Sequence, residues 1–285
     1  MGFIGLGRMG RPMAANLEAA GFPVLRFDPF VPVSARTEPA QGWTDDLTRI
    51  ARTSVSVSVL PDGKVTDSVL RSPDFLRDVA PGHVHISMAT IGAEQARSLS
   101  AELAERAVVF VDAPVSGSAT LVAAAQISCM VGCEPDVFEG IRPLLAAMTR
   151  DQLHLGPVGA GAAMKLAIQA LIGITNQGVA EALVLAEASG ISRDLALDAI
   201  AVSAVATPYA SYKRSVYTSP HPAREPVAAP ISLLQKDLRL TLADAGSLHA
   251  PMPLTRAASA LLDEAAAAGL AAADVGAVIE RLGQP

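Results

Sequence analysis

The first 21 residues, MGFIGLGRMGRPMAANLEAAG, contain the feature that most constrains how this chain can fold. Gly5, Gly7 and Gly10 form a Gly-x-Gly-x-x-Gly pattern that follows a short apolar run and precedes an amphipathic segment. This pattern is typical of a strand that turns tightly into a helix whose N-terminus holds a pyrophosphate. The segment therefore predicts the start of a dinucleotide-binding βαβ unit, in which Gly21 ends the first helix.

A second strand-like run, PVLRFDPF, reaches Asp28, which lies eighteen residues after Gly10. In a dinucleotide-binding unit, an acid about twenty residues beyond the glycines accepts hydrogen bonds from the adenosine ribose hydroxyls. A carboxylate there repels a 2′-phosphate, so the spacing favours NAD, while the nearby Arg26 and Arg36 leave NADP open. The alternative is that Asp28 only begins the turn at Pro29.

The composition indicates a soluble globular protein with room for two domains. The chain has 285 residues, 51% of them hydrophobic, a net charge of −6 and 4% aromatic residues. With no basic excess and few aromatic side chains, nucleic-acid binding is not expected. No basic segment precedes the first strand, so we expect no signal peptide and a cytoplasmic protein. The apolar stretch 166–180 is interrupted by Gln169, Asn176 and Gln177, which favours a buried helix over a membrane span.

The chain has two cysteines, Cys129 and Cys133, in the run SCMVGC. They share one face if this run is a strand, and no His or Cys pair completes a metal-binding pattern. We therefore interpret both as small core residues and expect no metal site.

Residues 1–156 alternate between strand-like and helical patterns, which predicts a parallel sheet with helices on both faces. One of the helical segments is GAEQARSLSAELAERA at 92–107. The strand-like runs are TSVSVSVL at 53–60, HVHISMA at 83–89 and VVFVDAPV at 108–115.

From residue 157 to 285, long Ala- and Leu-rich helical periods replace the strands. The segment 217–230, YTSPHPAREPVAAP, contains four prolines and is predicted to be a loop. The sequence therefore predicts an α/β fold, with an N-terminal dinucleotide-binding domain at 1–156 and an all-helical domain at 157–285.

Lys165 is the most informative residue after the glycine motif. It lies in GPVGAGAAMKLAIQALIGITNQGVAEALVLAEASG, which predicts one helix over 158–189, about 48 Å long, that links the two domains. Lys165, Gln169 and Asn176 form a polar stripe on this otherwise apolar helix. An ordinary lysine would extend from such a helix to water. The small and apolar flanks and the upstream glycines, which let a ligand approach the backbone, instead favour a functional lysine.

These segments together resemble the β-hydroxyacid dehydrogenase family, which includes 3-hydroxyisobutyrate dehydrogenase, tartronate semialdehyde reductase, and glyoxylate and succinic semialdehyde reductases. The resemblance covers nearly the full length. It implies a Rossmann-type N-terminal domain joined by a long interdomain helix to an all-α domain like that of 6-phosphogluconate dehydrogenase. The matching motifs are GFIGLGRMGRPMAANL, LPD at 60–62, DAPVSGS and MVG at 112–132, GPVGAGAAMKLAIQ, and KDLRL at 236–240.

The resemblance also implies roles for individual residues. Lys165 would be the catalytic acid/base, and Lys236 would lie against both cofactor and substrate. The expected substrate-binding residues are Ser116, Gly117, Ser118, Gln169 and Lys236. The expected cofactor-binding residues are Gly5, Leu6, Gly7, Arg8, Met9, Gly10, Asp28, Leu60, Pro61, Thr90 and Lys236.

These residue types suit the chemistry. Hydride transfer between an alcohol and a nicotinamide requires the hydroxyl proton to leave, and the reverse reaction requires the carbonyl oxygen to be protonated. A lysine can do both. The PVSGS turn follows the carboxyl end of a strand and offers hydroxyls and backbone N–H groups to a carboxylate, although it could also be a plain flexible turn.

Four positions depart from the family pattern and leave the substrate open. Gln169 replaces Asn, Ser118 replaces a second Gly, Ala89 replaces Ser, and Ala229 replaces an aromatic residue. An imine reductase shares the fold but typically lacks the lysine, and a catalytically silent dinucleotide-binding scaffold is a further alternative. The Ala-rich segment 255–282 is more apolar than one copy of so small a domain should cover, so we expect a homodimer or homotetramer.

Overall fold

The structure is a computed structural model that describes residues 1–32, 34 and 42–282. Arg36, named above for the NADP alternative, lies outside these residues. The chain divides into two compact units, Met1–Lys165 and Leu166–Pro285. The division falls within the long helix α8 (Ala160–Ala188), close to the helix that the sequence predicts over 158–189.

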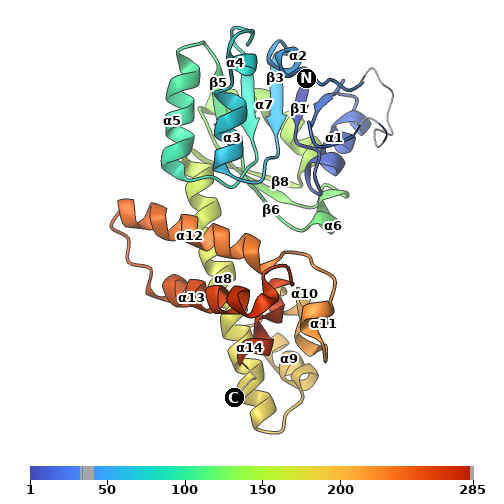
Figure 1. The fold of residues 1–285 in the computed structure, drawn as a ribbon, viewed down its shortest axis with the longest axis vertical. Coiled ribbons are helices and arrows are strands. Elements are labelled where there is room, and N and C mark those ends of the chain that lie inside the picture. The colour runs from blue at the N-terminus through green and yellow to red at the C-terminus, as the bar shows by residue number, and fades with distance from the viewer. Residues whose placement is uncertain (33, 35–41, 283–285) are drawn as a thin grey trace. The chain divides into compact units, whose positions relative to one another are not determined.

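The first unit is built on one sheet with strand order β2-β1-β3-β4-β5-β7-β6, with β8 paired to β7 (Figure 1). The strands are β1 (Gly2–Ile4), β2 (Leu25–Phe27), β3 (Val55–Ser58), β4 (Val84–Ser87), β5 (Val109–Asp112), β6 (Val115–Ser116), β7 (Ser128–Gly132) and β8 (Asp151–Gly156).

The predicted parallel arrangement holds for β1 to β5 and fails beyond them. Strand β7 is antiparallel to β5, and β6 is antiparallel to β7, while β8 runs parallel to β7. The reason lies in the connection between β5 and β7, which contains β6 and only the short helix α6 (Ala119–Val122). A parallel neighbour needs a crossover of a dozen or more residues, usually through a full helix.

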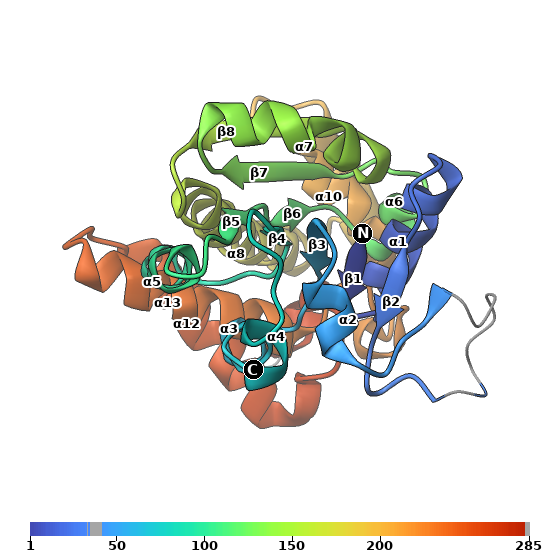
Figure 2. The same cartoon turned by 90° about the horizontal axis from the view of Figure 1, so that it is seen from above.

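Helices cover both faces of this sheet (Figure 2). One face packs against α1 (Gly10–Ala19) and α7 (Pro135–Met148). The other face packs against α2 (Leu47–Ala51), α3 (Gly63–Leu70), α4 (Pro73–Leu76) and α5 (Ala93–Ala104). Several of these helices begin at side-chain caps: Asp62 accepts the Val65 N–H at 2.9 Å, and Ser72 accepts the Phe75 N–H at 3.1 Å.

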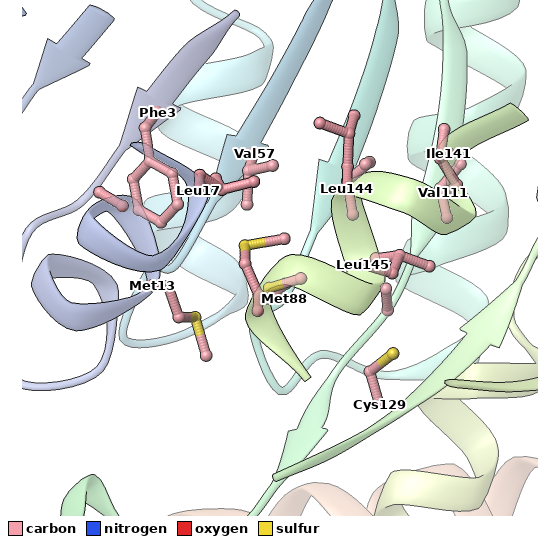
Figure 3. Packing of buried hydrophobic residues seen from close by; sticks show 14 of the residues in the cluster. Phe3, Met13, Leu17, Val57, Met88, Val111, Cys129, Ile141, Leu144 and Leu145 are labelled. Carbon is pink, nitrogen blue, oxygen red and sulfur yellow. The ribbon is translucent and has the colours of Figure 1, made fainter. Parts of the chain in front are cut away.

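The core between the sheet and the α1/α7 pair is shown in Figure 3. Phe3, Val57 and Val111 extend from β1, β3 and β5 and meet Leu17 of α1 and Leu145 of α7, all of them fully buried. Because side chains alternate between the two faces along each strand, these residues lie on one apolar face of the sheet, and this face packs against the apolar stripes of α1 and α7.

Both cysteines belong to this core, which confirms their interpretation as core residues. Burial raises the pKa of the Cys129 and Cys133 thiols to about 11, so both stay protonated at neutral pH.

The second unit is helical, as the sequence predicts. Besides the remainder of α8 it contains α9 (Arg193–Ala201), α10 (Pro208–Tyr212), α11 (Arg214–Thr218), η3 (Pro222–Arg224), α12 (Ile231–Ser247), α13 (Pro253–Ala265), η4 (Ala266–Leu270), η5 (Val275–Val278) and α14 (Ile279–Leu282). The predicted loop at 217–230 is irregular apart from the end of α11 and the short turn η3.

The Ala-rich segment 255–282 is partly buried within the second unit, and the oligomer expected from it stays a prediction. Leu262, Val275, Val278 and Ile279 are buried in the core of the second unit itself. The segment folds as α13, η4, η5 and α14, so its apolar side chains contact several neighbours within the unit.

Helix α8 is the one described helix that is long and apolar enough to cross a membrane by length and composition. A core helix of a soluble protein can meet the same criterion. In α8 the buried Gln169 donates to Asp237, and the buried Asn176 donates to the Val275 carbonyl at 3.1 Å. These polar contacts within the second unit indicate a core helix.

Candidate functional site

The glycine-rich turn between β1 and α1 has the shape that a dinucleotide needs. Gly5 has a φ of +88°, and a Cβ there would lie 2.4 Å from the Val59 carbonyl oxygen. A Cβ on Gly10 would lie 2.0 Å from the Gly5 carbonyl oxygen. At Gly7 a Cβ would meet no atom within 4 Å. Gly5 and Gly10 are thus required by the turn, whereas Gly7 leaves open space where a pyrophosphate can approach the N-terminus of α1.

Leu6, Arg8 and Met9, the other residues of this turn, differ in how much of each side chain is exposed to solvent. The Leu6 side chain is 4% exposed and belongs to the core, and Met9 packs partly against the same core. Arg8 is exposed. Leu6 and Met9 therefore shape the turn from below, and Arg8 is the side chain of the three that can reach solvent near a bound anion.

Asp28 follows β2 and is tied to the glycine turn. Its Oδ2 accepts the Leu6 N–H at 2.7 Å, and its Oδ1 accepts the Phe30 N–H at 2.9 Å. The carboxylate thus holds the first turn of the motif and also forms the turn that the alternative interpretation predicts. Because Asp28 is only half-buried, its oxygens keep further capacity to accept hydrogen bonds.

Arg26, part of the NADP alternative, is engaged inside the first unit. Its guanidinium pairs with Glu18 and lies 5.9 Å from the centre of the Trp43 ring, and the side chain is 3% exposed. These contacts hold Arg26 beneath the surface, which weakens the case for it as a ligand of a 2′-phosphate.

The other predicted residues of the first unit follow the carboxyl ends of the central strands. Leu60 and Pro61 come after β3, Thr90 comes after β4, and Ser116 comes after β5. Leu60 and Thr90 are half-buried, and Pro61 is exposed. In α/β sheets, ligands bind in the crevice at this edge. The fold therefore places these residues at the same edge as Gly7 and Asp28.

The Ser116–Ser118 segment turns sharply after β6. Gly117 has a φ of +148°, and a Cβ there would lie 2.3 Å from the Ile127 side chain, so only glycine fits. Ser116 is half-buried, and Ser118 is the N-cap residue of α6. The turn thus presents two hydroxyls and successive backbone N–H groups, which suits a carboxylate.

Lys165 lies on α8 and is 8% exposed. The helix starts at the edge of the sheet because Asp112, the last residue of β5, accepts the Gly159 N–H at 2.8 Å and the Ala162 N–H at 2.7 Å. Lys165 follows Ala162 by one helical turn, so its backbone is held at the edge where Ser116 and Thr90 lie.

Asp112 has a role that the sequence interpretation missed. It is fully buried, and this burial raises the pKa of its carboxyl to about 6, although the backbone N–H bonds act in the opposite direction. The signal was present in VVFVDAPV, where a charged residue follows a continuous apolar strand.

In the second unit, the side chains of Gln169 and Lys236 both contact the carboxylate of Asp237. The Gln169 Nε2 donates to Asp237 Oδ2, and the Lys236 Nζ lies 2.9 Å from Asp237 Oδ1. Asp237 is 2% exposed and lies on the apolar face of α12, between Leu234 and Leu238. An acid on an apolar helix face is a signal that could have identified Asp237 from the sequence.

Asn176 forms its hydrogen bonds with other residues than Asp237 and Lys236. Its Oδ1 accepts the Tyr209 hydroxyl at 2.9 Å and the Tyr217 hydroxyl at 3.0 Å, and its amide donates to Val275. Asn176, the third residue of the predicted polar stripe, is therefore part of the core of the second unit.

Among the described residues, no group of three or more His, Cys, Asp and Glu side chains is placed to hold a metal ion.

Two family models cover almost the whole chain. The model for the NAD binding domain of 6-phosphogluconate dehydrogenase matches residues 1–156. The model for the NAD-binding domain of NADP-dependent 3-hydroxyisobutyrate dehydrogenase matches residues 159–282. The 2-(hydroxymethyl)glutarate dehydrogenase of Eubacterium barkeri is 30% identical over 98% of this chain and 93% of its own length. The chain belongs to the β-hydroxyacid dehydrogenase family.

Other members of the β-hydroxyacid dehydrogenase family are also similar to this chain over most of its length. The 3-hydroxyisobutyrate dehydrogenase of Pseudomonas aeruginosa is 33% identical over 88% of this chain and 87% of its own length. The structure of the Mycobacterium tuberculosis 3-hydroxyisobutyrate dehydrogenase with L-serine has a TM-score of 0.88, with 30% identity, and covers 99% of this chain and 98% of that one. An imine reductase from Myxococcus stipitatus, at 18% identity and a TM-score of 0.65, shares the fold.

This β-hydroxyacid dehydrogenase is thus an NAD(P)-dependent oxidoreductase, as its sequence predicts. It has the Rossmann-type domain, the helical domain and the long helix α8 that the family resemblance implies.

Proposed function

We propose that this chain oxidises a small β-hydroxyacid to its semialdehyde with NAD, and catalyses the reverse reduction, with Lys165 as the acid/base. The observation that carries the proposal is the buried Lys165, held one turn after Ala162 at the carboxyl edge of the sheet. Burying an ammonium is costly, so its place at this edge calls for a reason, and this edge is where α/β folds bind their ligands.

The substrate class follows from the names of the relatives. 3-Hydroxyisobutyrate, 2-(hydroxymethyl)glutarate and L-serine each carry a hydroxymethyl group on the carbon that bears a carboxylate. We propose the same class for this chain, with the substrate carboxylate on Ser116, Gly117 and Ser118.

Residues of the first unit would hold the cofactor. The open backbone at Gly7 and the N-terminus of α1 suit the pyrophosphate, and Asp28 suits the adenosine ribose. Leu60, Pro61 and Thr90 would border the nicotinamide. When bound, NAD accepts the hydride from the carbinol carbon.

The proton is moved by the protein. In the oxidative direction the Lys165 Nζ, in its neutral form, accepts the substrate hydroxyl proton, and in the reductive direction it returns that proton to the carbonyl oxygen. Gln169 and Lys236 would orient the substrate, and Asp237 would hold both by accepting from one and pairing with the other. The long Gln169 side chain and the small Ala229 would give a pocket different from the usual family pattern.

We further propose that residues 1–156 and 157–285 act as the dinucleotide-binding and substrate domains of a cytoplasmic homodimer or homotetramer. The dehydrogenase interpretation is supported by the family matches, and the oligomer by exposed leucines on α8.

A coenzyme-reduction screen tests the function. The purified chain is assayed with NAD and NADP against 3-hydroxyisobutyrate, L-serine, 2-(hydroxymethyl)glutarate and 3-hydroxypropanoate, and in reverse with succinic semialdehyde and glyoxylate. Turnover of a hydroxymethyl acid with NAD is expected. Dinucleotide binding with no turnover of any compound would indicate a silent scaffold, and reduction of a cyclic imine in place of these compounds would indicate an imine reductase.

A further inference from the structure

Asp112 makes an unusual connection between the sheet and α8. It is 0% exposed, and its two carboxylate oxygens accept separate backbone N–H groups, Gly159 at 2.8 Å and Ala162 at 2.7 Å. These amides flank the start of α8. The carboxylate thus neutralises part of the positive end of the helix dipole and holds the first turn of α8 against the sheet.

The surroundings of this carboxylate leave it no alternative position. A Cβ on Gly132 of β7 would lie 2.4 Å from Asp112 Oδ1. A Cβ on Gly161 would lie 2.2 Å from the Met130 carbonyl oxygen and 2.8 Å from the Asp112 carbonyl oxygen. Two glycines therefore let the first turn of α8 pack directly on β5 and β7, with the acid enclosed between them.

A buried acid is a costly way to cap a helix. Asp46 caps α2 through the Thr48 N–H at 2.9 Å while remaining exposed to water. Asp112 loses its hydration, and this desolvation raises the pKa of its carboxyl to about 6. The cost suggests a function beyond capping, since an exposed cap would stabilise the helix start equally well.

We propose that Asp112 is a positioning residue that acts through the first turn of α8 to hold Lys165 at the place where it exchanges a proton with the substrate. Ala162, which donates to Asp112, and Lys165 lie one turn apart on the same face of α8. This inference rests on the acid/base role proposed for Lys165. Because a displacement of about 1 Å at a catalytic group can lower the rate about 100-fold, a modest loosening of this turn suffices to affect turnover.

The decisive variant is Asp112→Asn, which keeps the side-chain shape and places an NH₂ group against one of the two backbone N–H donors. We expect kcat to fall by about 10- to 100-fold, with KM and the Kd for NAD changed by less than about threefold. Asp46→Asn is the matched control, because it alters a helix-capping acid of the same unit far along the chain. It should leave kcat unchanged.

The outcomes separate this inference from the proposed function. If Lys165→Ala retains full turnover, the acid/base assignment itself is wrong. If Lys165→Ala is inactive and Asp112→Asn has the kcat of the unmodified protein, only the positioning role is wrong. A Kd for NAD that rises in proportion to the loss of kcat would also overturn it, since that result indicates a general disturbance of the first unit.

Hydrogen exchange in the unmodified protein tests the same idea if Asp112→Asn does not fold. The Gly159 and Ala162 amides should exchange only through rare opening of the first turn of α8, and their protection should rise as the pH falls through about 6, because the raised pKa of Asp112 makes its protonated form favour the closed turn. Among the described residues, titratable or charged groups near Asp112 or Gly159 include Cys133 beside β7, and Arg97 with Glu94 on α5. Fast exchange of these two amides, or protection that falls over this pH range, would overturn the inference, since the first turn of α8 would then not be held by Asp112.

Discussion

The Lys213 Nζ lies 2.7 Å from each carboxylate oxygen of Asp274, and both side chains are at most 2% exposed. Asp274 also accepts the N–H groups of Ala228, Ala229 and Gly276. This buried pair therefore fastens the proline-rich loop to η5 within the second unit.

Replacing Lys213 with Met should destabilise the second unit by about 3 to 5 kcal/mol, because the Asp274 charge stays buried without its cation. All three tyrosines of the chain, Tyr209, Tyr212 and Tyr217, lie in this unit, whereas Trp43 lies in the first, so the tyrosine bands of the near-ultraviolet circular dichroism spectrum, separated from the tryptophan bands, report its unfolding in denaturant. Arg239→Gln, which breaks the exposed pair with Asp263, is the control and should cost about 1 kcal/mol or less. Equal losses for both variants would contradict the assignment.

Lys165→Ala should lower kcat by about 10²- to 10⁴-fold, as expected for loss of general acid/base catalysis, with little change in the Kd for NAD. Steady-state kinetics and cofactor titration measure the two quantities. The exposed Lys64 on α3 is the control, and Lys64→Ala should keep normal turnover. Near-normal kcat for Lys165→Ala would remove it from the mechanism.

Asp28→Asn should narrow the preference for NAD over NADP, because the neutral amide no longer repels a 2′-phosphate. The ratio of kcat/KM for the two coenzymes is the measurement. An amide can still accept one of the two backbone N–H groups that Asp28 now holds, so the glycine turn should persist. Asp74→Asn, at an exposed ion pair, should leave the ratio unchanged. The prediction is wrong if the unmodified protein already prefers NADP.

His85 should make the first unit sensitive to acid. It lies between the Ser56 hydroxyl at 2.8 Å and the Ser58 hydroxyl at 3.0 Å, and burial lowers its pKa from 6.5 to about 3. The unfolded chain binds a proton here below pH 6.5, whereas the folded chain binds it only near pH 3. As the pH decreases from 6.5 to about 3, the free energy of unfolding should therefore fall by up to about 1.4 kcal/mol per pH unit.

The variant His85→Asn isolates this contribution, because Asp112, with its raised pKa, acts in the opposite direction between pH 3.8 and about 6. The destabilisation caused by His85→Asn should shrink as the pH falls from 6.5 towards 3. Trp43 is the single tryptophan and lies in the first unit, so its fluorescence follows the relevant transition. His249→Asn at an exposed position is the control, and a destabilisation by His85→Asn that does not vary with pH would contradict the prediction.

The exposed face of α8 should bind a second copy of this chain. Met164, Leu171 and Leu185 are 41%, 63% and 70% exposed and repeat at multiples of seven residues, which places them on one face of the helix. Sedimentation at micromolar concentration should show a species at least twice the 29.3 kDa chain mass, which Leu171→Glu and Leu185→Glu shift towards the monomer. Leu153→Glu on β8 is the control, and a purely monomeric unmodified protein would refute the prediction.

Local patterns were enough to predict β1 to β5, the helices α1 and α5, and the long helix α8. The glycine motif identified β1, the turn and α1, and the alternating run at 53–60 identified β3. The apolar period around Lys165 predicted α8 within two residues at its start and one at its end. These features depend on interactions between residues close in the sequence, so the sequence carries them directly. The boundary between residues 156 and 157 and the roles of the site residues remain predictions.

The sequence by itself determined the alternation of strands and helices up to about residue 156, the helical character of the remainder, the dinucleotide motif and the family. Only the tertiary structure decided that β7 is antiparallel to β5, that Asp112 holds the start of α8, and that Asp237 joins Gln169 to Lys236. The last two link residues 50 and 68 positions apart in the sequence. Whether a buried acid has a partner depends on which distant segments fold against it, and no local period or spacing contains that information.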